Sequence, residues 1–486
     1  MKKNSISTYY KNLSAPIKAS FWFLICSVLQ KGISFITTPI FTRLMDTSEY
    51  GAYSVFMSWE SIISIFITLN LSHGVYAQGL VKYEDDRKRY SSSLQGLTFL
   101  LIVIWTIVYL IFRGFFNNIF SLNTTYMLLM IISIWISSVF NFWASEQRVE
   151  YKYKHLVIIT LIASIMSPIA GIIFIHFMQD NVLARILGLV TTYALTYTWM
   201  FISQIWRGKK LYLKKYWKHA LNFNIPLIPH YLSQTILASS DRIMINEMIN
   251  SSTAGIYSLA YSLSMIMTIV NNALMQTISP WIYKKIKAQQ IKDIANIAYP
   301  SLVLIAIVNI ILIAFAPEAV RIFAPSEYYD AIWIISPIAM SVFFMFAYDL
   351  FAKFEFYFEK TKLIATATVI GATLNIVLNY IFIKIFGYYA AGYTTLLCYM
   401  LYSLFHFIAM RKVCKDKCNN VQPYQTKVLL KIAITFLCLG FIFLILYKSM
   451  IVRYLFIFIL LMVLFVYRNN IKKQLNNICS VRQNVN

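Results

Sequence analysis

The chain has 486 residues, of which 59% are hydrophobic and only 13% are charged, and its formal net charge is +24. So few charged residues cannot cover a soluble globule of this length, and the mean hydropathy of +0.64 agrees. The composition therefore argues against a soluble nucleic-acid-binding protein, which the charge alone would suggest, and predicts an integral membrane protein.

Fourteen apolar segments follow one another along the chain. A helix of ~17 to 25 apolar residues crosses the ~30 Å hydrocarbon core of a bilayer, so we predict an all-α integral membrane protein with fourteen membrane-spanning helices. The predicted spans are residues 17–43, 52–73, 92–112, 126–143, 156–177, 182–205, 221–244, 254–278, 294–315, 331–351, 363–386, 389–410, 428–446 and the shorter 451–466.

Lysine and arginine are concentrated in every second loop. If the N-terminus is cytoplasmic, the inner loops hold 33 of the 43 basic residues. The positive-inside rule then places both termini in the cytoplasm.

Two stretches of the chain resemble each other. Residues 43–54 read RLMDTSEYGAYS and residues 242–258 read RIMINEMINSSTAGIYS, with a weaker echo between residues 163–166 and 372–375. A repeat of six helices, an even number, inserts both copies in the same orientation, so we expect two lobes about an axis along the membrane normal, with a cavity between them. The expected divisions are an N-terminal six-helix lobe 1–206, a cytoplasmic linker 207–220, a C-terminal six-helix lobe 221–412, a cytoplasmic loop 413–427, and two extra helices with a cytoplasmic tail 428–486.

Motifs for cofactor-dependent or hydrolytic chemistry are absent from the sequence. It has no phosphate-binding Gly-x4-Gly-Lys-Ser/Thr loop, no dinucleotide-binding glycine pattern and no His-Glu-x2-His, and its predicted outer loops are short. Six scattered cysteines lack the partners of a metal site, and none lies in an outer loop. We therefore expect no enzyme activity, cofactor, metal or disulfide, and the first apolar run is too long for a cleavable signal.

Short motifs identify a family resemblance. The segments TPIFTRL at 38–44, EYGAY at 49–53, SDR at 240–242 and AGIY at 254–257 resemble the bacterial polysaccharide-export flippases for O-antigen and capsule repeat units. That family belongs to the MOP superfamily, together with the MATE exporters and the peptidoglycan-precursor flippase.

The resemblance implies a function. Such flippases move undecaprenyl-diphosphate-linked oligosaccharide from the cytoplasmic to the outer leaflet of the bacterial cytoplasmic (inner) membrane, and polymerases and glycosyltransferases of the same pathway are expected contacts. Fourteen helices resemble the peptidoglycan-precursor flippase, whose two extra helices line a groove for the lipid tail. O-antigen flippases more often have twelve, so the role of the last two helices is left open.

Two ionisable residues lie deep inside the predicted spans. Lys31 lies twelve residues before Arg43, or ~18 Å from the outer end of its span at 1.5 Å per residue, too deep to snorkel to the surface. Glu60 lies ~12 Å down the next span by the same rise. A charge at mid-bilayer costs ~3 kcal/mol even on the lenient scale, so Lys31 is expected either to face a hydrated cavity or to form a buried pair with Glu60.

Basic residues in or beside the spans are the candidate cargo-binding groups, because ammonium and guanidinium groups bind phosphate oxygens. They are Lys31, Arg185, Arg43 and Arg242. For Arg43 and Arg242, which the repeat sets at matching positions, anchoring at the outer surface or pairing with Asp46 and Asp241 is an equal alternative.

Titratable residues in the spans are the candidates for charge pairing or ion coupling. They are Glu60, Asp241, Asp349 and His230. Asp349 stands four residues before Lys353, a spacing that favours an ordinary intrahelical pair, and a lone membrane histidine such as His230 is more often a packing residue. Pro39, Pro226 and Pro229 are candidate hinges, or else fixed kinks.

The expected mechanism is alternating access. Without a nucleotide motif, the driving force is expected to be an H⁺ or Na⁺ gradient, the membrane potential or removal of product. Two alternatives remain open: a MATE-type multidrug or cation antiporter, which would want acidic rather than basic groups in its cavity, and a polymerase or ligase of the same lipid-linked sugars.

Overall fold

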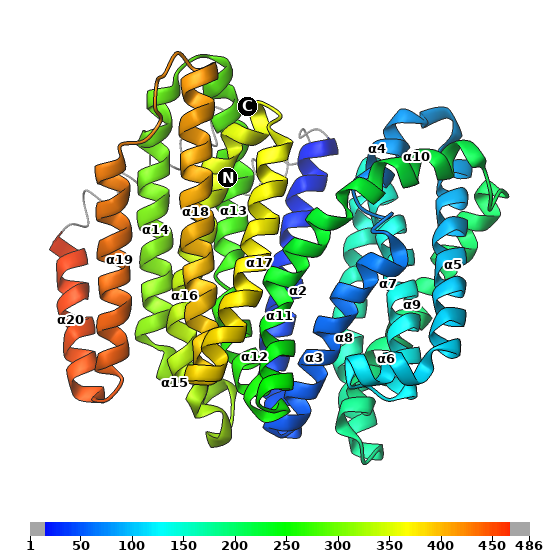
Figure 1. The fold of residues 1–486 in the computed structure, drawn as a ribbon, viewed down its shortest axis with the longest axis horizontal. Helices are drawn as coiled ribbons and strands as arrows, with labels where there is room; N and C mark the ends of the chain where they lie inside the picture. Colours follow the sequence, from blue (N-terminus) through cyan, green and yellow to red (C-terminus); the bar gives the residue numbers. More distant parts are fainter. Residues whose placement is uncertain (1–14, 467–486) are drawn as a thin grey trace, which may run out of the picture. The chain divides into compact units, whose positions relative to one another are not determined.

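The chain folds into helices connected by short turns (Figure 1). The structure, a computed structural model, describes residues 15–466, and no strand occurs in that range. The predicted N-terminal segment 1–14 and most of the expected cytoplasmic tail, residues 467–486, lie outside the described residues. Contacts divide the chain into two compact units, Met1–Ser239 and Ser240–Asn486. The lobe boundaries expected from the sequence stay predictions.

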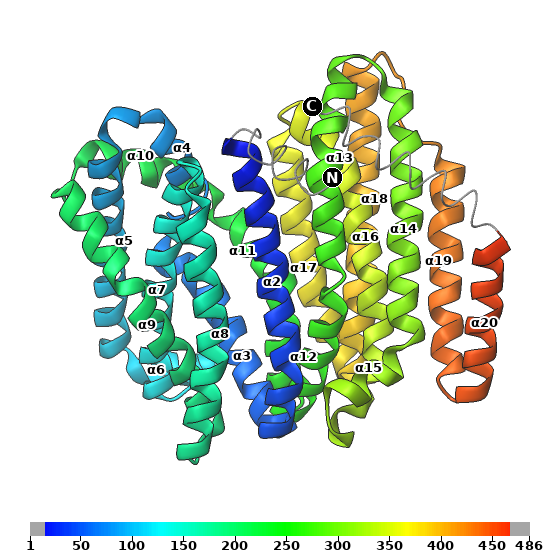
Figure 2. The same ribbon diagram turned by 180° about the vertical axis from the view of Figure 1, so that it is seen from behind.

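Unit 1 is an up-and-down arrangement of long helices with three short ones at its ends. Its elements are α2 (Ala15–Leu44), α3 (Thr47–Thr68), α4 (Val75–Lys82), η1 (Glu84–Asp86), α5 (Arg87–Ile111), α6 (Arg113–Phe120), α7 (Thr124–Val149), α8 (Tyr153–Phe177), α9 (Asn181–Gly208), α10 (Lys214–Asn224), η2 (Ile225–Leu227) and the beginning of α11 (Ile228–Met248). In both views α4 and α10 lie at one end of this unit and α6 at the other (Figures 1 and 2).

Unit 2 is built around one buried helix, α16, which packs against α12, α14, α18 and α19. Its elements after α11 are α12 (Ser251–Met265), α13 (Thr268–Lys287), η3 (Ile291–Ile294), α14 (Ala295–Ala314), α15 (Ala316–Phe323), η4 (Ser326–Ala331), α16 (Ile332–Tyr357), α17 (Thr361–Phe386), α18 (Tyr389–Lys417), α19 (Thr426–Leu446) and α20 (Met450–Val466).

The all-α membrane fold class is confirmed, but the number of spans is not. Helices occupy all fourteen predicted segments, and eleven helices in the described range are long and apolar enough to cross a membrane. Those falling short are α3, α11 and α20. The first two carry the polar residues Glu60 and Asp241, and α20 is short. The count of fourteen therefore stays a prediction.

The two similar stretches of sequence form the same local structure. Asp46 caps α3 by accepting a hydrogen bond from the Glu49 amide (2.8 Å), and the Glu49 carboxylate accepts one from the Asp46 amide (3.0 Å). Asn250 caps α12 by accepting from the Thr253 amide (2.9 Å). In both helices a glycine follows the cap by five residues and a tyrosine by seven. The caps explain why both motifs begin a helix, while the six-helix repeat stays a prediction.

The prolines differ in their effect on the helices. Pro226 lies in η2 and Pro229 in the first turn of α11, so the α-helical segment predicted at 221–244 is interrupted there. Pro39 lies inside the continuous helix α2. A further break between α12 and α13, at Ile266 and Met267, contains no proline or glycine, so the sequence does not predict it. Whether the prolines act as hinges stays a prediction.

Helices α8 and α9 cross at two glycines. A Cβ added to Gly188 would lie 2.3 Å from the Gly171 backbone nitrogen, which no side chain can relieve. The missing side chains therefore allow the two backbones to approach closely, as is common where membrane helices pack.

Substituting Gly188→Ala should force α8 and α9 apart and cost about 1–3 kcal/mol of stability. The thermal midpoint of the detergent-purified protein measures this. Gly114→Ala in α6, where an added Cβ meets nothing within 4 Å, is the matched control and should leave the midpoint unchanged or raise it. Equal midpoints for the two variants would refute the close crossing.

Candidate functional site

Arg185 lies among aromatic side chains in unit 1. It is in the second turn of α9, and its guanidinium carbon lies 3.9 Å from the ring centroid of Phe41 on α2 and 3.7 Å from that of Tyr53 on α3. Tyr50 is 5.2 Å away. Contacts this short are cation–π contacts, which are stronger when the groups are shielded from water. Arg185 therefore ties three helices together while its side chain stays only partly buried.

Lys31 and Glu60 have different environments. Lys31 lies on α2 with an exposed side chain, so it is not sealed among apolar residues. Glu60 on α3 is buried, and its carboxylate accepts a hydrogen bond of 2.5 Å from the Ser133 hydroxyl on α7. Nothing in the sequence pointed to Ser133 as a partner. The predicted pairing of Lys31 with Glu60 stays a prediction.

Arg43 and Arg242 do not occupy matching positions relative to the helix caps. Arg43 lies in the last turn of α2, three residues before Asp46, where it donates to the Pro39 carbonyl (2.7 Å). Arg242 precedes Asn250 by eight residues, and its guanidinium carbon lies 4.2 Å from the Tyr261 ring. At 1.5 Å per residue the difference in depth is ~7.5 Å. Arg242 is thus the deeper and more enclosed of the two.

Asp241 is the centre of a buried polar cluster in unit 2. One carboxylate oxygen accepts hydrogen bonds from Tyr257 (2.5 Å) and Thr395 (2.8 Å), and the other accepts from the Asn379 amide (2.6 Å). The Asn379 carbonyl oxygen in turn accepts from Thr394. Four helices, α11, α12, α17 and α18, therefore meet at one carboxylate, which is 1% exposed.

Asn375 extends this cluster by one turn of α17. Its side-chain oxygen accepts from the Ser240 hydroxyl at 3.0 Å, and its amide nitrogen is buried without a hydrogen-bond partner among the described residues. Asn375 and Asn379 stand four residues apart and so share one face of α17. The cluster offers several side-chain oxygens, the ligand type that hard cations prefer.

The other coupling candidates lie elsewhere in the structure. Asp349 accepts from Lys353 at 2.6 Å, which confirms the intrahelical pair that the spacing favours. His230 lies in the first turn of α11, and its Nδ1 is buried without a hydrogen-bond partner in the described part of the chain.

Sequence reasoning missed a second buried pair in unit 2. A hydrogen bond of 2.7 Å joins Glu355 Oε1 on α16 to His406 Nδ1 on α18. The two residues are 0% and 1% exposed. Glu355 lies beyond the predicted span 331–351, in the connection between two predicted spans. Because α16 continues to Tyr357, the residue is buried instead.

A polar network in unit 1 was missed for the same reason. Glu146 lies beyond the predicted span 126–143, but α7 continues to Val149 and buries it. Its carboxylate accepts two hydrogen bonds from Arg207 (3.1 and 3.3 Å) and one from Gln204 (2.7 Å), which itself accepts from Gln95 (2.7 Å). A carboxylate with this many partners is fixed in position.

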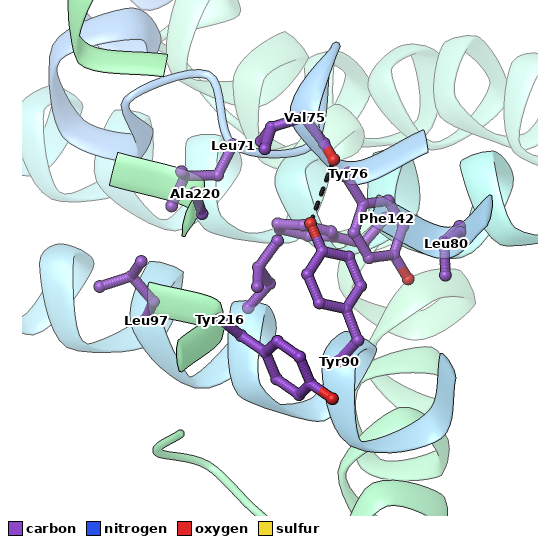
Figure 3. Close-up of a cluster of buried hydrophobic side chains, with 10 residues drawn as sticks. Leu71, Val75, Tyr76, Leu80, Tyr90, Leu97, Phe142, Tyr216 and Ala220 are labelled. Atoms are coloured by element: carbon purple, nitrogen blue, oxygen red, sulfur yellow. Dashed lines mark hydrogen bonds between the residues drawn. The ribbon is translucent and has the colours of Figure 1, made fainter. Parts of the chain in front are cut away.

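A hydrophobic cluster supports this end of unit 1 (Figure 3). Tyr76, Tyr90 and Phe142 pack together in it, and the Tyr90 hydroxyl donates to the Val75 carbonyl (3.1 Å). At its edge, Tyr216 on α10 donates to Asp86 (2.5 Å). Burial and the neighbouring Asp86 carboxylate raise the pKa of Tyr216 to about 12, so the hydroxyl stays protonated and keeps α10 docked.

Solved structures that are similar to this chain include transporters. The chain is similar to the lipid II flippase MurJ in an inward closed conformation, with a TM-score of 0.66 and 17% identity over 92% of this chain and 99% of that one. It is also similar to an inward-facing multidrug resistance MATE family transporter of the MOP superfamily, with a TM-score of 0.64 and 13% identity over 79% and 95%. The helices and their buried polar groups thus define a multi-pass membrane protein with a MOP-type transporter fold.

The family follows from the sequence comparison. A family model described as "Polysaccharide biosynthesis protein" matches residues 17–286, more than half of the chain, and the chain belongs to this family. Two relatives are each 21% identical: protein 1 of the Lsg locus of Haemophilus influenzae, over 74% of this chain and 89% of that protein, and a Haloferax volcanii protein described as "Probable low-salt glycan biosynthesis flippase Agl15", over 80% and 82%. The family resemblance inferred from the short motifs is confirmed.

Removing one member of the Glu355–His406 pair should cost more than removing both. His406→Leu leaves a buried carboxyl without its partner, at a cost of about 3 kcal/mol, whereas Glu355→Met with His406→Leu replaces both by apolar groups and should recover most of the loss. Thermal midpoints of the purified variants measure this. A double variant as unstable as His406→Leu would contradict it.

Proposed function

We propose that this protein is a flippase that moves undecaprenyl-diphosphate-linked oligosaccharide repeat units from the cytoplasmic to the outer leaflet by alternating access. Membership of the polysaccharide biosynthesis family supports this class of cargo. The structural observation that supports it most is a difference in burial between acidic and basic side chains. The acidic side chains of Glu60, Asp241 and Glu355 are buried and hydrogen-bonded. The basic groups Lys31 on α2, Arg185 on α9 and Arg242 on α11 keep exposed surface.

Exposed basic groups suit a diphosphate cargo. Lys31 presents an ammonium group, and Arg185 and Arg242 present guanidinium groups that are only partly buried. The ring centroid of Tyr53 lies 3.7 Å from the guanidinium carbon of Arg185, so the ring contacts the face of the guanidinium group. The N–H donors of that group point outward in the guanidinium plane. Stacking therefore fixes the orientation of the group and leaves in-plane donors for phosphate oxygens.

The polyprenyl tail would occupy a groove in unit 2. Residues of α14, α19 and α20 line an apolar pocket of about 450 Å³ there, and Lys431 lies among them near the beginning of α19. This gives the last two helices a role: they provide an apolar wall for a lipid chain, as the resemblance to the peptidoglycan-precursor flippase implies. The tail then stays in an oily environment while the headgroup crosses.

Asp241 is the proposed coupling group for H⁺ or Na⁺. It joins four helices of unit 2 through its hydrogen bonds, so binding or release of a cation at this carboxylate changes the packing of all four. Asn375, Asn379, Thr394 and Thr395 supply the neighbouring oxygens. Asp349 is less suited, because Lys353 already neutralises it.

The protein is proposed to lie in the bacterial cytoplasmic membrane with both termini inside. In unit 1 the basic connections 82–89, 148–154 and 207–218 lie at the same end of the antiparallel helices, as the positive-inside rule requires of the cytoplasmic end. Polymerases and glycosyltransferases of the same pathway are the expected partners.

A MATE-type antiporter is the alternative. Its fold is shared, but a site for cationic drugs needs an accessible carboxylate. Of the three acidic residues inside the predicted spans, Glu60 and Asp241 are buried and Asp349 is paired with lysine. A polymerase or ligase reading is less favoured, because the connections opposite the basic loops are short.

Removing the Lys31 charge should impair export. Lys31→Gln keeps a polar side chain but loses the charge-assisted interaction with phosphate, so we expect flipping to fall at least about tenfold with normal protein level. Accumulation of lipid-linked oligosaccharide and loss of surface polysaccharide measure this. Lys384→Gln, which removes an exposed lysine near the end of α17, is the control. Unchanged surface polysaccharide with Lys31→Gln would rule out Lys31 as a cargo-binding residue.

Removing the Asp241 charge should uncouple transport from its driving ion. Asp241→Asn keeps the size of the side chain but can neither bind a proton nor hold a cation as strongly. In proteoliposomes, flipping of a fluorescent lipid-linked oligosaccharide should no longer respond to an imposed H⁺ or Na⁺ gradient. Asp349→Asn should keep the response. A gradient response that survives Asp241→Asn would exclude this residue as the coupling site.

A further inference from the structure

A charged pocket lies at the end of unit 1 that carries α4 and α10. Its volume is about 850 Å³, and the thirteen lining residues comprise seven lysines or arginines, five acidic residues and Gly208. They come from η1, the beginning of α5 and the ends of α7 and α9. None of these residues belongs to the candidate transport groups described above.

Most of the acidic residues in this pocket are already neutralised. Glu84, Asp86, Glu150 and Glu146 each form an ion pair with another lining residue, at 3.1, 3.7, 2.6 and 3.1 Å, the partners being Arg87, Arg89, Lys152 and Arg207. The lining residues outside these four ion pairs include three lysines and one carboxylate, that of Asp85. The lysines are Lys88, Lys209 and Lys210. The pocket therefore has an excess of positive charge.

Arg207 is a lining residue of the pocket, and hydrogen bonds hold its side chain in place. Glu146 holds two of its N–H groups and the Ser203 carbonyl accepts a third (3.3 Å). A guanidinium group has five N–H donors, so two remain. Because Glu146 is fixed by Gln204 as well, the Arg207 side chain needs little ordering when a ligand arrives.

The lysine-bearing rim is held rigidly against α5. A Cβ on Gly208 would lie 2.2 Å from the Lys88 carbonyl oxygen, so only glycine permits this approach. The Ser92 hydroxyl donates to the Lys210 carbonyl at 3.0 Å. Lys209 has a φ of 54°, a left-handed conformation at the end of α9 where glycine is usual, yet the position carries a lysine.

Apolar side chains flank the rim. Trp206, Leu211 and Tyr212, which flank residues 207–210 in the sequence, are 78%, 51% and 59% exposed. Tryptophan and tyrosine of membrane proteins concentrate at the level of the lipid headgroups. Basic side chains flanked by exposed aromatic and apolar ones are the composition typical of the headgroup level of a bilayer.

We propose that this pocket binds the phosphate of an anionic phospholipid of the cytoplasmic leaflet. Lys209 and Lys210 contact the phosphate oxygens as point charges, and Arg207 donates its two remaining N–H groups to them. The bound lipid anchors the end of unit 1 to the membrane surface, independently of the cargo that the protein carries.

The test compares lipid binding by the full-length protein and two charge-matched variants. Lys209→Gln with Lys210→Gln removes pocket charges, and Lys214→Gln with Lys218→Gln removes two exposed lysines of α10 outside the pocket. Native mass spectrometry measures the affinity for dioctanoyl phosphatidylglycerol in micelles. We expect about a tenfold loss for the pocket variant and little change for the control.

Two further ligands test whether the pocket recognises negative charge and acyl chains. Dioctanoyl phosphatidylcholine should bind weakly to all three proteins, because its headgroup carries no net negative charge. Inorganic pyrophosphate should bind at least about tenfold more weakly than phosphatidylglycerol, because it lacks acyl chains. Equal losses in both double variants, or an unchanged affinity in the pocket variant, would overturn the proposal. Pyrophosphate binding as tight as that of the lipid, and lost in the pocket variant, would overturn its assignment to lipid.

Discussion

The cost of a charged or polar group inside a bilayer governs this structure. Such a group needs a partner, because hydrocarbon offers no hydrogen bonds and screens charge poorly. The acidic residues Glu60, Asp241 and Glu355 meet this need by hydrogen bonding to neighbouring helices, and each thereby joins helices far apart in sequence. Arg185 meets it through aromatic rings. The polar residues that make the spans costly to insert are thus the ones that fix how the helices pack.

Burial also distinguishes the charged side chains that hold helices together from those proposed to bind cargo. Carboxylates that are buried and hydrogen-bonded would have to break their own packing to bind a bulky cation, whereas partly exposed guanidinium and ammonium groups keep surface that a phosphate can reach. Asp241 holds four helices of unit 2 together through its hydrogen bonds, and the coupling role proposed for it rests on this same carboxylate. The family and the charge arrangement therefore favour the same class of cargo.

Much of the helical fold could be predicted from the sequence, because a bilayer sets the length of apolar segments; the orientation inferred from lysine and arginine stays a prediction. Helix ends were less predictable. Glu146 and Glu355 lie just outside apolar runs, and only the extension of α7 and α16 by several residues buries them. The residues around Asp241 come from α12, α17 and α18, and no local pattern in the sequence links Asn379 to Thr395. Partners across helices depend on side-chain direction and depth, which periodicity alone does not give.

Helix α11 belongs to both compact units, since the division falls between Ser239 and Ser240 in the middle of a continuous helix. Asp241, the second residue beyond that division, is fastened to the helices of unit 2, whereas the proline-containing turn η2 lies at the other end of α11, among residues of unit 1. The second half of α11 is therefore fixed to unit 2 by hydrogen bonds, while its first turn directly follows an interruption of the α-helix. If η2 acts as the hinge predicted for Pro226 and Pro229, a rotation there would leave the half of α11 that is hydrogen-bonded through Asp241 in place.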